Sequence, residues 1–170
     1  MIKTRILSIV AALSLLCLPV KMLAQETVAS PNGNIVVSFD MKDGIPMYSV
    51  TYKGKPAVNE SRLGLELWSE NGRNEFNADK LKSTSDVEKT SLYNGFEIQK
   101  VEKWGKDETW KPVWGEENSI RNHYNEMAIT INQPKFDRHI VIHFRAYDDG
   151  MAFRYEFPQQ KNLNYFVIKD

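Results

Sequence analysis

The stretch HIVIHFRAYDDGMAFRYEF, residues 139–157, indicates most plainly which kind of fold the chain adopts. Apolar residues occupy every second position from Ile140 to Ala146 and again from Met151 to Phe157, on either side of the turn sequence DDG. Successive side chains of a β-strand point to opposite faces, so this alternation is typical of strands with one buried face. The stretch therefore predicts two antiparallel strands joined by a tight turn.

The same alternation recurs in short segments separated by turns that contain Gly, Asn or Asp. Residues 73–91 are polar without clear periodicity, which predicts a loop, and a turn is expected at Asn71-Gly72. No segment has the spacing of a long amphipathic helix, so the sequence predicts an all-β, antiparallel sandwich. The further predicted strands are NIVVSFDM (34–41), MYSVTY (47–52), RLGLELW (62–68), FEIQKVEKW (96–104), MAITIN (127–132) and YFVIKD (165–170).

Residues 1–24 have the organisation of a secretory signal peptide. Two basic residues, Lys3 and Arg5, precede an apolar run, and Ala24 offers a small residue for cleavage. The run is short for a membrane span, so no membrane attachment is expected after cleavage. The only cysteine, Cys17, lies in this segment, and an exported chain without disulfides suits a bacterial periplasm.

Residues 25–170 are enough chain for one domain with its own core. They carry 19 basic and 22 acidic side chains, because three of the 22 basic residues fall in the predicted signal peptide. No basic stripe is present, so a nucleic acid is not an expected partner. The sequence stops inside the apolar segment YFVIKD, and we therefore expect the sandwich to be incomplete at its C-terminal end.

The stretch DETWKPVWGEENSIRNHYNE, residues 107–126, is the part of the chain richest in side chains that can bind or react. We expect it to form a loop followed by the start of a strand. Its two indoles either stack on the apolar face of a sugar ring or, more simply, pack in the interior and fix the loop. The candidate substrate-binding or interdomain residues are Trp110, Trp114, Glu116, Arg121, His123 and Tyr124.

The acidic residues and histidines give weaker indications of chemistry. His139 and His143 would lie about 13 Å apart on one strand, too far to share a metal ion. We expect both to face solvent or a second polar layer, and His123 to be structural. Glycoside hydrolysis needs two carboxylates across a sugar, but acidic loops are common and the sequence does not fix the spacing. The candidates for such a pair are Asp107, Glu108, Glu116, Glu117 and Glu126.

Several long stretches together resemble the N-terminal domain of glycoside hydrolase family 97. They are the 107–126 stretch, FRAYDDGMAFRYEFP and NLNYFVIKD, preceded by SPNGNIVVSF, YSVTYKGKP and SRLGLELW. The likeness extends over residues 27–170 in the family's order, and within the family it is greatest to the periplasmic α-glucosidase of the starch-utilisation system of gut Bacteroidetes. It implies a β-super-sandwich similar to galactose mutarotase, which in the family precedes a catalytic (β/α)₈ barrel.

The resemblance also implies a function for the whole enzyme. Members hydrolyse α-glucosidic bonds with inversion or α-galactosidic bonds with retention, with a calcium ion at the active site. The barrel supplies the acid and the base or nucleophile, and it has no counterpart in this sequence. The N-terminal domain's calcium-binding glutamate falls downstream of the part matching YFVIKD, so we expect neither a catalytic residue nor a calcium ligand here.

The expected function is the N-terminal, carbohydrate-associated domain of a periplasmic α-glucosidase that acts on starch-derived oligosaccharides. In this interpretation residues 107–126 pack against the catalytic barrel and border its active site. Two alternatives stay open: a standalone carbohydrate-binding module, and the corresponding part of a family 97 α-galactosidase.

Overall fold

The computed structural model describes residues 25–67, 90–163 and 166–169. The described part is dominated by antiparallel strands, which confirms the predicted all-β sandwich. Two short 3-10 turns, η3 (Pro134–Phe136) and η4 (Lys161–Leu163), join or follow the strands. The turn expected at Asn71-Gly72 and nearly all of the loop predicted for 73–91 lie outside the described residues.

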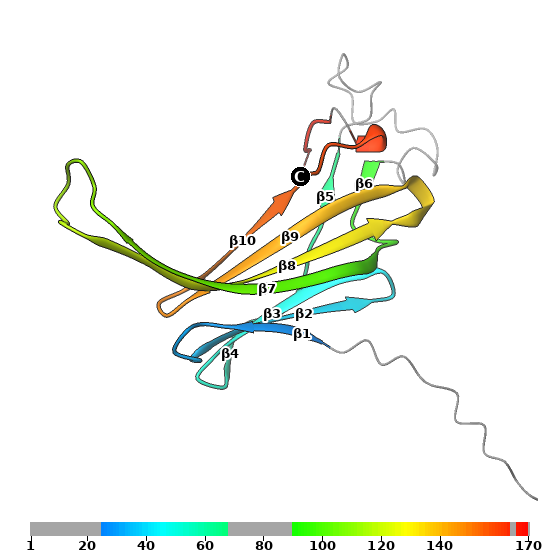
Figure 1. The fold of residues 1–170 in the computed structure, drawn as a ribbon. Helices are drawn as coiled ribbons and strands as arrows, with labels where there is room; N and C mark the ends of the chain where they lie inside the picture. Colours follow the sequence, from blue (N-terminus) through cyan, green and yellow to red (C-terminus); the bar gives the residue numbers. More distant parts are fainter. Residues whose placement is uncertain (1–24, 68–89, 164–165, 170) are drawn as a thin grey trace, which may run out of the picture.

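Two four-stranded sheets pack face to face (Figure 1). The first has the order β1-β2-β3-β4 and the second the order β10-β9-β8-β7, so neighbours in the sequence are neighbours in each sheet. The strands of the first sheet are β1 (Glu26–Ala29), β2 (Ile35–Lys42), β3 (Ile45–Tyr52) and β4 (Lys55–Arg62). Those of the second are β7 (Glu97–Trp110), β8 (Ile120–Gln133), β9 (Arg138–Tyr147) and β10 (Met151–Glu156).

Tight turns join β2 to β3 and β3 to β4. Each contains two residues with positive φ, Asp43-Gly44 (50° and 75°) and Lys53-Gly54 (48° and 75°). Two-residue turns of this kind match the right-handed twist of the flanking strands, which is why Gly takes their second position. The expectation that turns containing Gly separate these strands is therefore confirmed at both places.

The core lies between the sheets, where the apolar halves of the alternating strands meet. β1 lies against β8 and β9, and β2 lies against β9. Phe144 of β9 is at the centre, with its ring 6.1 Å from that of Phe39 and 6.0 Å from those of Tyr48 and Phe153. The fully or almost fully buried apolar side chains around it include Val37, Met127, Ile129, Ile131, Ile140 and Ile142.

The predicted strand 62–68 is broken at Gly64. Its φ of 147° is unfavourable for other residues, and a Cβ atom there would lie 2.5 Å from Cδ1 of Tyr93. The Gly64 backbone N–H instead donates to the Tyr155 hydroxyl at 3.0 Å. After this break, β5 (Leu65–Glu66) pairs with β6 (Ser91–Leu92) in a two-stranded sheet.

The prediction of a continuous strand at YFVIKD is wrong, because the described residues 166–169 do not form one. Ile168 forms a single antiparallel bridge with Leu67, and the Lys169 N–H donates to the Glu66 carbonyl at 2.7 Å. Residues Val167 and Ile168 are exposed, because no strand covers them in the described part of the chain.

Candidate functional site

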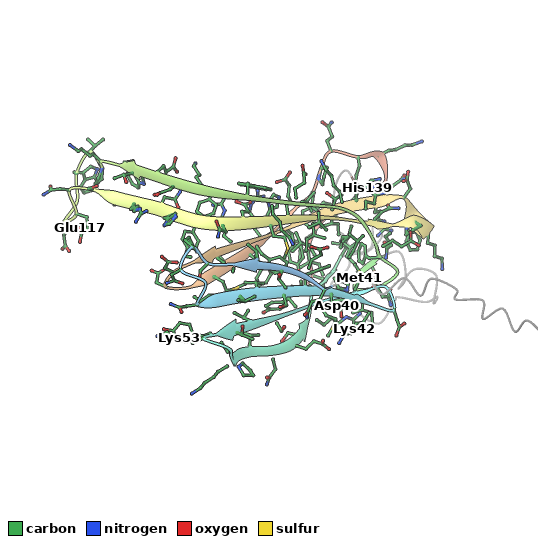
Figure 2. The ribbon with its side chains drawn as sticks, turned by 60° about the horizontal axis from the view of Figure 1, so that its bottom comes forward. Asp40, Met41, Lys42, Lys53, Glu117 and His139 are labelled. Atoms are coloured by element: carbon green, nitrogen blue, oxygen red, sulfur yellow. The ribbon has the colours of Figure 1, made fainter. Side chains whose placement is uncertain are left out.

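The β7–β8 hairpin is longer than the sandwich that carries it. Both strands have 14 residues, whereas β9 pairs with β8 only as far as the Tyr124–Tyr147 partners. Beyond this point the hairpin continues as a two-stranded ribbon, residues 107–123, which we call the arm. Figure 1 shows the arm extending away from the packed sheets. In Figure 2, Glu117 lies at the far end of the arm, and His139 lies at the other end of the molecule.

The arm corrects the expectation of a loop for most of residues 107–126. Residues 107–110 pair with 120–123 in a continuous antiparallel register, and only 111–119 form a loop. These strands carry polar residues on both faces, so they lack the apolar alternation by which a strand is found in a sequence. Pairing with each other, rather than burial of one face, holds them in place.

The register divides the hairpin's side chains between two faces. Asp107 and Thr109 lie opposite His123 and Arg121, on the face that continues into the core through Met127. The other face carries Trp104, Lys106, Glu108 and Trp110, opposite Glu126, Tyr124, Asn122 and Ile120. We call this second face the outer face, because it points away from the first sheet. Of the predicted site residues, Trp110 and Tyr124 are thus on the outer face, and Arg121 and His123 on the inner one.

The arm's tip is exposed and carries large apolar side chains among polar ones. The exposed fractions are 51% for Trp110, 99% for Val113, 89% for Trp114 and 37% for Ile120. The interpretation that both indoles pack in the interior is therefore wrong. Glu116 is also exposed in the tip loop, away from Arg121 and His123 on the paired strands.

The inner face of the arm is stiffened by a bidentate ion pair. Nε and Nη2 of Arg121 donate to the two carboxylate oxygens of Asp107 at 2.8 and 2.7 Å. This hydrogen bonding lowers the pKa of Asp107 below its usual value, and the nearby His123 acts in the same direction. At the arm's base, the Asn125 side-chain amide donates to the Ala29 carbonyl at 2.8 Å and ties the hairpin to β1.

The outer face of the sandwich holds a polar cluster that sequence reasoning did not assemble. The Glu126 carboxylate, 2% exposed, accepts hydrogen bonds from His143 Nδ1 and Arg145 Nε, both at 2.7 Å. The Trp104 indole lies edge-on to the His143 ring, with 6.4 Å between centroids. Arg145 also stacks over the Tyr124 ring at 4.5 Å, which buries Tyr124 against Tyr147.

On the opposite side of His143, β10 contributes two charged residues. Nε2 of His143 lies 3.2 Å from Oε2 of Glu156, and the same oxygen accepts from Arg154 Nη1 at 2.9 Å. The Arg154 hydrogen bond lowers the pKa of Glu156, and the His143 charge and contact add to that effect. We call Trp104, Glu126, His143, Arg154 and Glu156 the outer cluster.

The two strand histidines occupy separate environments. His143 is buried and belongs to a second polar layer, which was one of the two predicted alternatives. The other alternative, a position facing solvent, does not apply to it. His139 is half-buried, and its Nδ1 lies 3.2 Å from the Gln99 side-chain oxygen. The cluster could have been predicted from the charge pattern of β9. His143 and Arg145 take successive outer positions on this strand, which has a neighbouring strand on each side.

Within the described ranges, no group of three or more His, Cys, Asp or Glu side chains is close enough to hold a metal ion. In the same ranges, no helix has the length and hydrophobicity needed to cross a membrane.

The family's sequence model described as Glycosyl-hydrolase 97 N-terminal matches residues 28–170. A retaining α-galactosidase from Bacteroides thetaiotaomicron is 26% identical over 136 residues, covering 77% of this chain and 16% of that protein. The chain thus spans about one sixth of this curated relative.

Solved structures show the same fold within larger enzymes. A glycoside hydrolase family 97 enzyme from Pseudoalteromonas sp. strain K8, solved with panose and with acarbose, is 30% identical with a TM-score of 0.68. The match covers 84% of this chain and 19% of that one. A β-arabinopyranosidase, 17% identical with a TM-score of 0.66, shares the fold over 85% of this chain and 20% of its own. Together with the family match, these relationships show that the chain belongs to glycoside hydrolase family 97 and carries that family's N-terminal domain.

Proposed function

We propose that the chain is the N-terminal accessory domain of a periplasmic α-glucosidase that acts on starch-derived oligosaccharides. The acid and the base belong to a catalytic barrel, and this domain packs against that barrel and borders its active site. The choice of an α-glucoside is supported by the 30% identity to an enzyme solved with panose and acarbose. The match to a retaining α-galactosidase favours an α-galactoside as the second candidate.

The arm is the observation that carries the docking proposal. Val113 and Trp114 are almost fully exposed at its tip, and the half-exposed Trp110 and Ile120 lie opposite each other just below them. Isolated apolar residues are common on protein surfaces, but a cluster at the end of a projecting ribbon is typical of an interaction site. Tryptophan is also among the residues that contribute most to protein interfaces when a partner buries it.

The ion pair below the tip supports the same role. Asp107 and Arg121 join the two strands of the ribbon on its inner face, which stabilises their pairing just below the tip. A preorganised arm loses less conformational entropy on docking than a flexible loop does. The arm therefore has the form of a rigid element that seats apolar side chains in a partner surface.

A reconstitution experiment tests the docking. Residues 25–170 are mixed with the Pseudoalteromonas enzyme from which only the segment matching them has been removed, and binding is followed by analytical ultracentrifugation together with hydrolysis of an α-glucoside. We expect a complex with restored hydrolysis, and an affinity at least about tenfold lower for Trp110→Ala/Trp114→Ala. Tyr52→Ala, which removes a similarly exposed aromatic ring from β3, is the control and should bind normally. Equal affinities for both variants, or no complex at all, would contradict the proposal.

A further inference from the structure

The outer cluster is a second candidate binding site, distinct from the arm, and it has the composition of a ligand-binding site. It brings together the half-exposed Trp104 of β7, His143 of β9, and the exposed pair Arg154 and Glu156 of β10. The intervening β8 residue opposite His143 is Ala128, whose small side chain leaves space on the sheet for the indole to reach the imidazole. Residues from three strands therefore converge on one spot.

Glu126 fixes the orientation of this site from below. Because its buried carboxylate accepts from His143 Nδ1, the imidazole holds a proton on Nδ1 and directs Nε2 toward β10. That Nε2 atom is buried and has no aligned hydrogen-bond partner, although Oε2 of Glu156 is 3.2 Å away. Because this atom has almost no surface open to solvent, the groups that a ligand can reach are the exposed side chains around it, Trp104, Arg154 and Glu156.

We propose that the outer cluster is a binding site for a segment of a neutral oligosaccharide. A sugar hydroxyl both donates and accepts, so one hydroxyl can donate to the Glu156 carboxylate and accept from the Arg154 guanidinium beside it. Arg154 offers further donors for a neighbouring hydroxyl, and the exposed part of the Trp104 indole offers an apolar surface for the C–H face of a pyranose ring.

Charge balance favours a neutral ligand. The carboxylates of Glu126 and Glu156 are matched by the guanidinium groups of Arg145 and Arg154, so the site has no excess of either sign to attract an ionic ligand. The α-linked glucan class rests on the proposed function, whereas the site itself rests on this geometry. It is also separate from the arm's tip, because Trp104 and Trp110 are six residues apart along β7, about 20 Å in an extended strand.

Calorimetric titration of residues 25–170 with maltoheptaose tests the site, with cellohexaose as the β-linked comparison. We expect maltoheptaose to bind, and its Kd to rise at least tenfold in Trp104→Ala and in Glu156→Gln. Tyr52→Ala is the control, since it removes an exposed aromatic ring from β3 in the other sheet, and it should leave the Kd unchanged. Thermal melts of all variants check that each is folded. If Trp104→Ala does not fold, Glu156→Gln still tests the site, because it changes an exposed side chain without changing its shape.

The outcomes separate this inference from the proposed function. An unchanged Kd in both cluster variants, or loss of binding in Tyr52→Ala, would overturn the assignment of the site, as would the absence of binding by either sugar. Binding of cellohexaose in place of maltoheptaose, still sensitive to Trp104→Ala, would support the site and contradict the α-linked substrate class. The docking of the arm is decided independently by the reconstitution experiment.

Discussion

Replacing Phe144 by alanine is expected to destabilise the sandwich by about 4 to 5 kcal/mol. The side chain is fully buried, and its ring lies about equally far from those of Phe39, Tyr48 and Phe153, at 6.1, 6.0 and 6.0 Å. Truncating a core phenylalanine costs about 3 to 5 kcal/mol, and each aromatic pair contributes about 0.5 to 1.5 kcal/mol beyond its buried area. The loss of three such contacts places Phe144→Ala in the upper part of the range.

Phe153→Ala is the matched control, because it removes the same ring from the same aromatic group. Phe153 is 41% exposed, and we expect its truncation to cost about 2 kcal/mol, since less apolar surface returns to water. Urea unfolding of residues 25–170, followed by circular dichroism, measures both. With a slope of about 2 kcal/mol per molar urea, the midpoint should fall by about 2 M in Phe144→Ala and about 1 M in Phe153→Ala.

Similar midpoints for the two variants would refute this reasoning. So would a loss below about 1 kcal/mol in Phe144→Ala, because a fully buried ring between two sheets cannot be removed so cheaply. Either result would mean that the sheets do not pack on each other around Phe144.

Three further changes probe the fold and the arm. Gly64→Ala should lower the melting temperature clearly, because a Cβ atom would lie 2.5 Å from the Tyr93 ring at a φ of 147°. Arg121→Ala should return the pKa of Asp107 toward its usual 3.8, seen by carboxyl NMR titration. Because the folded pKa is lowered, this pair stabilises the fold above the unfolded pKa and the effect is lost as the pH falls through the folded one. Glu126→Gln should cost about 2 to 3 kcal/mol in urea unfolding, less than a fully buried pair because Arg145 is partly exposed.

The sequence was most informative where one face of a strand is buried. Ile140, Ile142 and Phe144 alternate with polar residues because the first sheet covers only one side of β9, and the structure buries all three. The turn at residues 148–150 was also predicted correctly, and Tyr147 and Gly150 close it with a backbone hydrogen bond of 2.8 Å. Local periodicity reports this kind of burial directly.

The candidate site could be predicted only in part, because it depends on pairing between distant residues. Trp110 and Trp114 were identified as candidates, but their exposure follows from a ribbon that extends beyond β9, which local periodicity does not reveal. The burial of Glu126 depends on partners 17 and 19 residues away, His143 and Arg145. From the sequence alone, a charged residue inside a strand is predicted to be exposed. Only the strand register shows that oppositely charged residues lie beside it and allow its burial.

The most direct test of the proposed function is the apparent mass, in the source cells, of the protein that an antibody against residues 27–170 detects. We predict a band several times larger than the 19.6 kDa of this chain, because family 97 relatives carry this domain as about one fifth or less of their length. A single band at or just below 19.6 kDa would contradict an accessory domain joined to its catalytic barrel. It would favour a standalone carbohydrate-binding module.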